Sequence, residues 1–428
     1  MGLGLKALNR FAGSSAIDKL GLRKLAERGL YQSTRAGFVV AGKAGRSFNA
    51  AQKLLSPARL PRAAGTGLFD LTPTTEQEML RDAAQSFAHE QLRPAAAAAD
   101  RNSAAPATLL QESAALGFAV LGIPEAFGGA GNERSAVTNV LIAAALAEGD
   151  LSLAVACLAP GAVATALSLW GNEAQQAQYL PAFAADNAPT AALAVQEPQP
   201  LFDAFALRTS AARRGDGYVL NGIKSLVPRG ADCELFVVAA QLDGSARLFL
   251  VESKTKGISL RAEPAMGLRA AATAQLTLQE VSLGADALLG SVEDYGECIA
   301  LSRLAWCALA AGCGKAVLDH VIPYANERIA FGEPISHRQA VAFMIADISV
   351  ELEGLRLATC RAAAKAERGE DFVVEAAIAR QLATDKAVRI GNDGVQVLGG
   401  HGFTKEYPVE RWYRDLRACG FMEGVLLV

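Results

Sequence analysis

The sequence has little of the residue types that bind metal ions or form disulfide frameworks. It contains four histidines and seven cysteines among 428 residues, and no two cysteines have the C-x-x-C spacing. In a chain of this length, an odd and scattered set of thiols is typical of reduced, buried cysteines in a cytosol-like compartment. We therefore predict no metal site at these cysteines: Cys157, Cys233, Cys298, Cys307, Cys313, Cys360 and Cys419.

Aromatic residues are also scarce, at 6%, and neither sign of charge dominates. The 41 basic and 44 acidic residues give a formal net charge of −3. This balance gives no support to a nucleic-acid partner, which would favour a basic chain. The chain is 51% hydrophobic, with many alanines and leucines that favour helices, and its length suggests two to four domains.

A stretch without charge, residues 151–171, is long enough to cross a membrane. Pro160-Gly161 interrupts it, alanine and serine fill much of it, and acidic residues lie on both sides. Proline and small residues argue against a continuous lipid-facing helix. We predict buried core helices here.

The N-terminal segment differs in charge from the rest. Residues 1–63 hold twelve Lys or Arg and only Asp18 and Glu27 as acids, a net charge of +10. Three interpretations remain open: a basic amphipathic region in peripheral contact with an anionic membrane, a transit peptide, or a helical arm that packs on its own oligomer. The expected location is therefore cytoplasmic, with or without contact at the inner face of a membrane, or the mitochondrial matrix in a eukaryote.

The patterns along the chain predict helices, then strands, then helices. Thr72 before Pro73 predicts a helix start, and the helical pattern runs to about residue 186 with a glycine-rich loop at 122–131. Strands are predicted at 235–240, 247–251 and 274–281, with a hairpin turn at Asn221-Gly222. Long helices are predicted at 298–328, 340–367 and 372–397.

This order implies segregated helical and sheet layers rather than a doubly wound α/β fold. We predict an α+β fold, mainly α. Its parts are a basic extension (1–70), an N-terminal helical domain (71–188), a middle antiparallel β domain (189–292) and a C-terminal helical bundle (293–428).

Two motifs could bind phosphate. The glycines of Gly399-Gly400-His401-Gly402 follow a helix and would let backbone N–H groups approach a pyrophosphate closely, although a turn that ends a helix has the same pattern. Arg328 follows a long helix and could bind phosphate oxygens, or could simply face the helix dipole. Neither matches a G-x-G-x-x-G fingerprint after a strand.

Glu423 is the candidate base. It lies in Cys419-Gly420-Phe421-Met422-Glu423-Gly424-Val425, with apolar neighbours whose burial would make a carboxylate more basic. A lone glutamate is more often a solvated surface residue. The position of Glu423 relative to the other motifs supports its assignment as the base.

In order and spacing, these motifs resemble the acyl-CoA dehydrogenase family over residues 71–424. The pattern YAxxRxxFGxPIxxxQAxxFMxAD and the pattern QxxGGxGF…EYPVER…RD are both matched. The matching residues are Tyr324-Ala325, Arg328, Phe331-Gly332, Pro334-Ile335, Gln339-Ala340, Phe343-Met344, Ala346-Asp347, Gln396, Gly399-Gly400, Gly402-Phe403, Glu406-Tyr407-Pro408-Val409-Glu410-Arg411 and Arg414-Asp415.

The resemblance implies a C-terminal four-helix bundle, a homodimer or homotetramer that holds FAD between subunits, an acyl-CoA substrate and reoxidation by electron-transfer flavoprotein. Glu423 is then the base that removes the α-proton. The thioester oxygen accepts a hydrogen bond from the backbone N–H of Glu423, and Arg303 and Gly424 lie at the substrate. The implied cofactor-binding residues are Arg328, Phe331, Gln339, Gln396, Gly399, Gly400, Val195, Gln196 and Pro228.

The alternative base position of the family, before the arginine that matches Arg303, holds Ser302, which cannot serve as this base. The flavin-facing motifs also depart from the family pattern: Gln196 and Pro228 replace threonines, and Leu226 replaces a tryptophan. Two hypotheses follow: an FAD-dependent dehydrogenase of fatty acyl-CoA, or a weakly catalytic or inactive homologue that is a structural subunit or binds acyl-CoA. Small residues in 151–171 are expected to line the acyl pocket.

Overall fold

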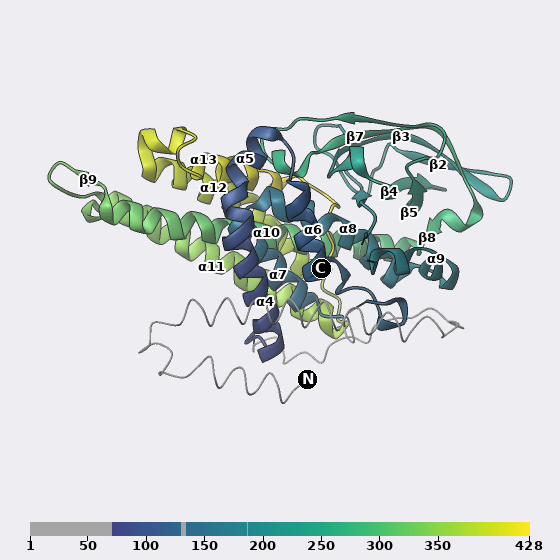
Figure 1. The fold of residues 1–428 in the computed structure, drawn as a ribbon, viewed down its shortest axis with the longest axis horizontal. Coiled ribbons are helices and arrows are strands. Elements are labelled where there is room, and N and C mark those ends of the chain that lie inside the picture. The colour runs from purple at the N-terminus through teal and green to yellow at the C-terminus, as the bar shows by residue number, and fades with distance from the viewer. Residues whose placement is uncertain (1–70, 130–133, 186) are drawn as a thin grey trace.

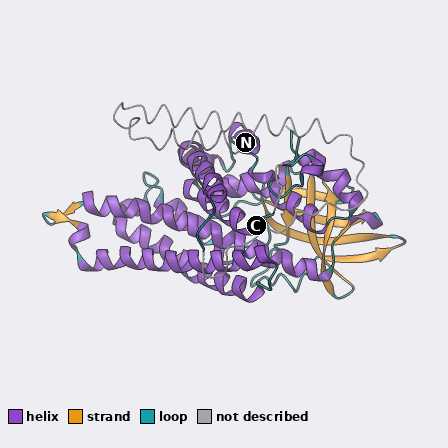
Figure 2. Ribbon diagram, turned by 90° about the horizontal axis from the view of Figure 1, so that it is seen from below, coloured by secondary structure: helices purple, strands orange, loops and turns teal. Residues whose placement is uncertain are grey.

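The computed structural model describes residues 71–129, 134–185 and 187–428. The basic segment 1–63 and its three interpretations lie outside these residues. The described chain has a group of shorter helices, a twisted sheet at one end, and long helices that extend away from the sheet (Figures 1 and 2).

The first helical region begins with a capping box. Thr74 accepts a hydrogen bond from the backbone of Gln77, and the Gln77 side chain accepts one from the backbone of Thr74. The predicted start at Thr72 was therefore wrong, because a reciprocal cap at Thr74 is available two residues later. The helices are α4 (Thr75–Phe87), α5 (Arg93–Asn102), α6 (Ala107–Leu116), α7 (Ala136–Gly149), α8 (Leu151–Trp170) and α9 (Glu173–Phe183).

The middle region is an eight-stranded sheet of mainly antiparallel pairs, in which β1 pairs in parallel with β4. The predicted hairpin at Asn221-Gly222 was wrong, because β3 runs through these residues at a bulge and the turn from β2 to β3 lies at Gly215-Asp216. The strands are β1 (Ala191–Ala194), β2 (Ser210–Arg214), β3 (Gly217–Val227), β4 (Leu235–Leu242), β5 (Ser245–Glu252), β6 (Ile258–Ala262), β7 (Ala274–Leu283) and β8 (Leu288–Leu289).

The C-terminal region contains three long helices and one short helix. The helix α10 (Val292–Glu327) packs against α7, α11 (Gln339–Arg368) and α12 (Val373–Leu398). The hairpin of β9 (Ile329–Ala330) and β10 (Glu333–Pro334) joins α10 to α11 at the far end of the bundle (Figure 1). The fourth helix, α13 (Val409–Leu416), has only eight residues.

Helix α8 is part of the protein core. Within the described residues, two helices, α8 and α10, are long and apolar enough to cross a membrane, but 89% and 83% of their most apolar windows are buried inside the protein. Their apolar side chains are therefore covered by other parts of the protein, and the burial predicted for residues 151–171 is confirmed. The predicted interruption at Pro160-Gly161 was wrong, because α8 continues through Pro160. All seven cysteines are buried free thiols, and the described residues hold no group of three or more potential metal ligands.

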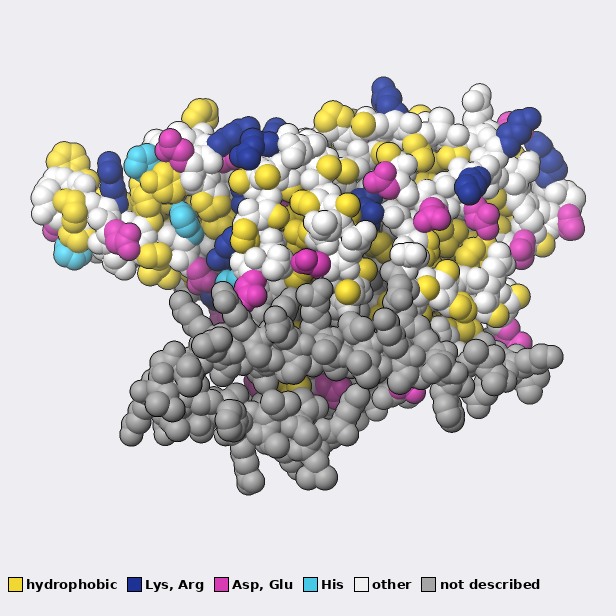
Figure 3. All heavy atoms as spheres, in the orientation of Figure 1, with side chains coloured by type: hydrophobic (Ala, Val, Ile, Leu, Met, Phe, Trp, Pro, Cys, Tyr) yellow, Lys and Arg dark blue, Asp and Glu magenta, His cyan; other side chains and the backbone are white. Residues whose placement is uncertain are grey.

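Charged side chains of both signs are intermingled on the described part of the face in Figure 3. Inside the protein, an ionic cluster joins the three regions of the chain. Arg414 of α13 contacts Asp100 of α5 at 2.9 and 3.0 Å, and Arg411 contacts Asp150 at 2.9 Å. Asp415 accepts a hydrogen bond from the backbone N–H of Leu268 in the sheet region at 2.7 Å. This cluster fixes α13, and with it the chain that leads to Glu423.

Candidate active site

Glu423 is buried, with 8% of its surface exposed, and its carboxylate is paired with Arg303 of α10. Arg303 Nε lies 3.0 Å from Oε1 and 3.1 Å from Oε2, and its Nη2 lies 2.9 Å from Oε1. Arg380 Nη2 of α12 lies 3.8 Å from Oε1. The expectation of a carboxylate among apolar neighbours was therefore incomplete, because two guanidinium groups reach it from helices far away in the sequence.

The ion pair restricts the orientation of the carboxylate. A guanidinium that donates to both oxygens is a charge-assisted, geometrically specific contact. The phenyl ring of Phe205 lies over the same guanidinium, with its centroid 5.9 Å from Cζ. Arg303 thus connects the candidate base to the loop that follows β1.

The backbone of Glu423 is held by Gln196, two residues after the end of β1. Its N–H donates to Gln196 Oε1 at 3.1 Å, and Gln196 is itself only 7% exposed. The family resemblance assigns this N–H to the thioester oxygen of the substrate. Here the glutamine that replaces a threonine accepts the same hydrogen bond.

Gly424 is fixed between β1 and α10. Its carbonyl accepts hydrogen bonds from Ser302 Oγ at 2.5 Å and from Trp306 Nε1 at 3.0 Å. Its φ of +75° is left-handed, and a Cβ there would lie 2.6 Å from Val195 Cγ2, so this position requires glycine. The hydroxyl of Ser302 is thus directed at the backbone of the candidate site.

The segment after β1, which contacts Glu423 through Gln196, is held by a buried lysine. Lys224 Nζ donates to the carbonyl of Val195 at 3.0 Å and to Glu197 Oε1 at 2.8 Å. Burial lowers the pKa of Lys224 to about 8, against the opposing effect of Glu197. Glu197 also accepts hydrogen bonds from the backbone N–H groups of Arg208 and Thr209.

Leu226 and Pro228 lie on the irregular end of β3. Leu226 has a φ of +53°, and its N–H donates to Glu263 Oε2 at 2.6 Å. Pro228 is buried and follows a bulge in the pairing of β3 with β7. The Glu263 carboxylate satisfies the N–H that this irregular backbone turns away from the sheet.

The residues predicted to bind the dinucleotide part of FAD are all exposed, and they lie at the other end of α10. Arg328, Phe331 and Gln339 lie at and after the end of α10, and Gln396, Gly399 and Gly400 end α12. Tyr324, near the end of α10, and His401, just after α12, connect these two sets of residues, because the Tyr324 hydroxyl lies 2.8 Å from His401 Nδ1. The rise of an α-helix places Arg328 roughly 37 Å from Arg303, so one chain does not bring these residues to Val195, Gln196 or Pro228.

The exposed group suits a phosphate-containing cofactor. A Cβ at Gly399 or Gly400 would meet nothing within 4 Å, so the backbone there is open to close approach. An exposed guanidinium, two amide side chains and this open backbone can donate to phosphate oxygens.

Three family models match consecutive parts of the chain. They are the acyl-CoA dehydrogenase N-terminal domain over residues 74–187, the middle domain over 192–281 and the C-terminal domain over 294–426. The chain belongs to the acyl-CoA dehydrogenase family. This is a family of FAD-binding oxidoreductases.

Relatives and a solved structure of the acyl-CoA dehydrogenase family support the assignment. The chain is 30% identical to a 3-(aryl)acrylate reductase of Clostridium sporogenes, over 82% of this chain and 95% of the relative. It is 32% identical to the mitochondrial short/branched chain specific acyl-CoA dehydrogenase of Rattus norvegicus, over 82% and 83%. Butyryl-CoA dehydrogenase from Megasphaera elsdenii has a similar structure, with a TM-score of 0.77 and 28% identity over 83% of this chain and 96% of that one.

The sequence patterns did not reveal Arg380 beside the Glu423 carboxylate, Trp306 at the Gly424 carbonyl or Phe205 over the Arg303 guanidinium. Their local sequences carry no sign of these contacts, because each reaches the site by tertiary packing from a different element. Ser302 was recognised only as a residue that cannot be the base, and the structure gives it a contact with Gly424.

Proposed function

We propose that this protein catalyses the α,β-dehydrogenation of a fatty acyl-CoA thioester to the trans-2-enoyl-CoA, with electrons passed to electron-transfer flavoprotein. The observation that carries the proposal is the Glu423 carboxylate, buried and oriented by Arg303 beside the end of β1. A general base must be close to the proton that it removes and held in one geometry. The names of the relatives, which include acyl-CoA dehydrogenases, support the substrate class.

FAD would be held by residues of two chains. Arg328, Phe331 and Gln339 with Gln396, Gly399 and Gly400 would bind its dinucleotide part, and Val195, Gln196 and Pro228 of another chain would face its flavin. The separation of the two groups along α10 supports a homodimer or homotetramer. When bound, FAD supplies the two-electron acceptor for the hydrogen on the β-carbon.

Within the chain, Glu423 takes the proton from the α-carbon of the thioester. Arg303 holds the carboxylate so that its orientation is set before the substrate arrives, which avoids reorganisation during the reaction. Gln196 must release the N–H of Glu423 if that group is to donate to the thioester oxygen. The substrate therefore competes with one hydrogen bond of about 0.5–1.5 kcal/mol.

A second candidate function is an acyl-CoA-binding or structural homologue with little turnover. The Gln196 side chain favours this function, because its Oε1 accepts the hydrogen bond of the Glu423 N–H at 3.1 Å. That N–H is the group that would otherwise donate to the thioester oxygen. In this case the thioester binds without activation of its α-proton.

The two candidates are separated by the visible spectrum of the purified protein, supplemented with FAD, during addition of acyl-CoA. Bleaching of the flavin absorbance is expected for the dehydrogenase. Glu423→Gln should abolish bleaching while FAD and acyl-CoA still bind, and Glu367→Gln, a buried glutamate that contacts Val137 N–H at 3.1 Å, serves as the control. A preparation that binds acyl-CoA but takes up no FAD would support the second candidate.

A further inference from the structure

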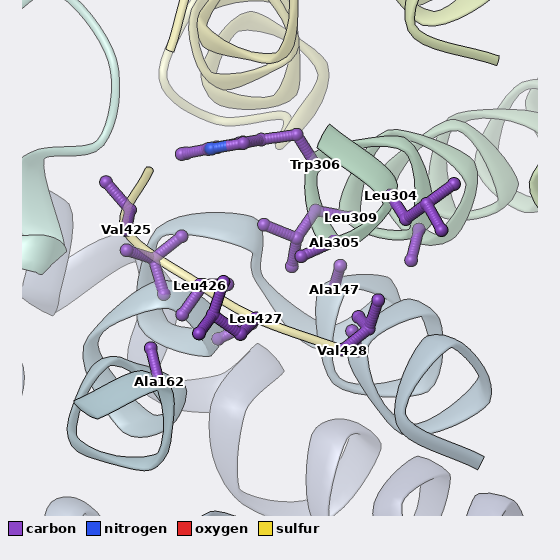
Figure 4. Packing of buried hydrophobic residues seen from close by; sticks show 14 of the residues in the cluster. Ala147, Ala162, Leu304, Ala305, Trp306, Leu309, Val425, Leu426, Leu427 and Val428 are labelled. Atoms are coloured by element: carbon purple, nitrogen blue, oxygen red, sulfur yellow. The ribbon is translucent and has the colours of Figure 1, made fainter. Parts of the chain in front are cut away.

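The segment after Glu423 fills an apolar space in the helical core. Val425, Leu426 and Val428 are each 2% exposed, and Leu427 is 9% exposed. The segment passes between α10 and α8, with Ala305 and Leu309 on one side and Ala162 on the other (Figure 4). Four consecutive apolar residues thus lie next to the candidate base.

Contacts at both ends hold the segment in place. At its start, Val425 pairs with Leu193 in an antiparallel bridge, directly after the Gly424 carbonyl that Ser302 and Trp306 bind. At its far end, the Val428 carbonyl accepts a hydrogen bond from buried Arg134 at 2.9 Å. Movement of the segment would break these contacts and expose four buried side chains.

The cavity around the segment has the lining expected of an acyl-binding space. It is formed by Ile142, Ala143, Leu158, Gly161, Thr165 and Ala305, among others, with Leu426, Leu427 and Val428 on its wall. The residual volume is about 30 Å³, which is room for one or two water molecules and not for an acyl chain. The small side chains of α8 were expected to line an acyl pocket, and the two leucines fill the space beside them.

We propose that Leu426 and Leu427 determine the acyl-chain length that the protein accepts, by filling the space that a longer chain would need. The inference rests on the proposed function, because an acyl group with its α-carbon at Glu423 would run along this space. With the segment in place, this space is closed to the acyl chain, so only an acyl group short enough to end before it can bind. Each leucine-to-alanine change removes roughly three carbon atoms from the wall and lengthens the space accordingly.

The test compares the dissociation constants of butyryl-CoA, octanoyl-CoA and palmitoyl-CoA for the full chain by titration calorimetry. The unaltered protein should bind butyryl-CoA at least tenfold more tightly than octanoyl-CoA. Leu426→Ala/Leu427→Ala should improve octanoyl-CoA binding relative to butyryl-CoA by at least tenfold. Leu276→Ala, which shortens a fully buried leucine of a separate core in the sheet, should leave the ratio unchanged.

The double variant Leu426→Val/Leu427→Val removes less volume. It takes the place of the double alanine variant in the test if that variant does not fold. It should shift the ratio in the same direction by about threefold. Equal binding of all three lengths to the unaltered protein, or an unchanged ratio in folded variants, would overturn the role of the two leucines alone. No binding at any length would overturn the proposed function as well.

Discussion

Arg303 and Glu423 are 120 positions apart in the chain and form a bidentate ion pair with three N–O distances between 2.9 and 3.1 Å. The pair joins the middle of α10 to the segment that follows α13. It therefore couples the orientation of the candidate base to the position of a core helix.

Arg303→Lys is expected to lower kcat by about 10–100-fold, with a smaller effect on KM, because an ammonium group lacks the planar two-nitrogen donor geometry that fixes the orientation of the carboxylate. Steady-state kinetics of the FAD-loaded protein checks this. Arg356→Lys is the matched control, since Arg356 forms a bidentate pair with Glu353 at 2.6 and 2.8 Å on the exposed side of α11. A rise in KM without a fall in kcat would contradict the positioning role.

Gly424→Ala is expected to destabilise the fold through two effects. A left-handed alanine costs about 1–2 kcal/mol, and its Cβ would lie 2.6 Å from Val195 Cγ2. Gly244→Ala is the control, because Gly244 has a φ of +80° and nothing within 4 Å of a Cβ, so it reports the backbone effect alone. Denaturant unfolding should show a larger loss for Gly424→Ala, and Val195→Ala should recover part of it. Equal losses of unfolding free energy in the two variants would show that the contact between the new Cβ and Val195 does not destabilise the protein.

Lys224→Met should cost about 3–5 kcal/mol of unfolding free energy, because it leaves the Glu197 carboxylate buried without its cation. The control is Arg214→Met, which removes one partner of the exposed Arg214–Glu280 pair and should cost about 0–1 kcal/mol. Adding Glu197→Gln to Lys224→Met should restore stability in part. A Lys224→Met protein as stable as the unaltered one would show that Glu197 does not depend on this lysine.

Asp415 should make stability depend on pH. Burial raises the pKa of this carboxyl to about 8, and its Oδ2 has no hydrogen-bond partner. Between about pH 4 and pH 8 the folded protein thus binds this proton more tightly than the unfolded chain. Unfolding free energy should therefore fall as pH rises through this range, by up to about 1.4 kcal/mol per pH unit from this group.

Asp415→Asn keeps an acceptor for the N–H of Leu268 and should flatten this dependence in denaturant unfolding at a series of pH values. Asp319→Asn, at an exposed i,i+4 pair with Lys315, should leave it unchanged. If unfolding free energy falls with pH just as steeply in Asp415→Asn, other groups of the ionic cluster cause the dependence.

Deletion of residues 1–63 should release the protein from anionic vesicles, because this segment carries a net charge of +10. Co-sedimentation with phosphatidylserine vesicles at low salt measures the loss, and neutral vesicles are the control. Binding that persists after the deletion would exclude the segment as the membrane contact and leave the transit-peptide and oligomer interpretations.

The strand and helix patterns of this chain are local properties, and most of them could be predicted. The alternation at 274–281 became β7, and the periodic apolar residues at 340–367 became α11, because each pattern has one face to bury. Local signals failed where a neighbour decided the outcome. Asn221-Gly222 has hairpin chemistry, but β3 continues through it because β7 pairs on both sides of the bulge.

The sequence by itself determined the family, the order of the three regions and the identity of Glu423 as the candidate base, since ordered motifs survive without coordinates. Only the tertiary structure decided what surrounds that base. Arg303 at its carboxylate, Gln196 at its N–H and Leu426 and Leu427 in the adjoining space come together through packing between distant elements. Such contacts depend on where helices and strands lie against one another, and no local pattern of residues records that.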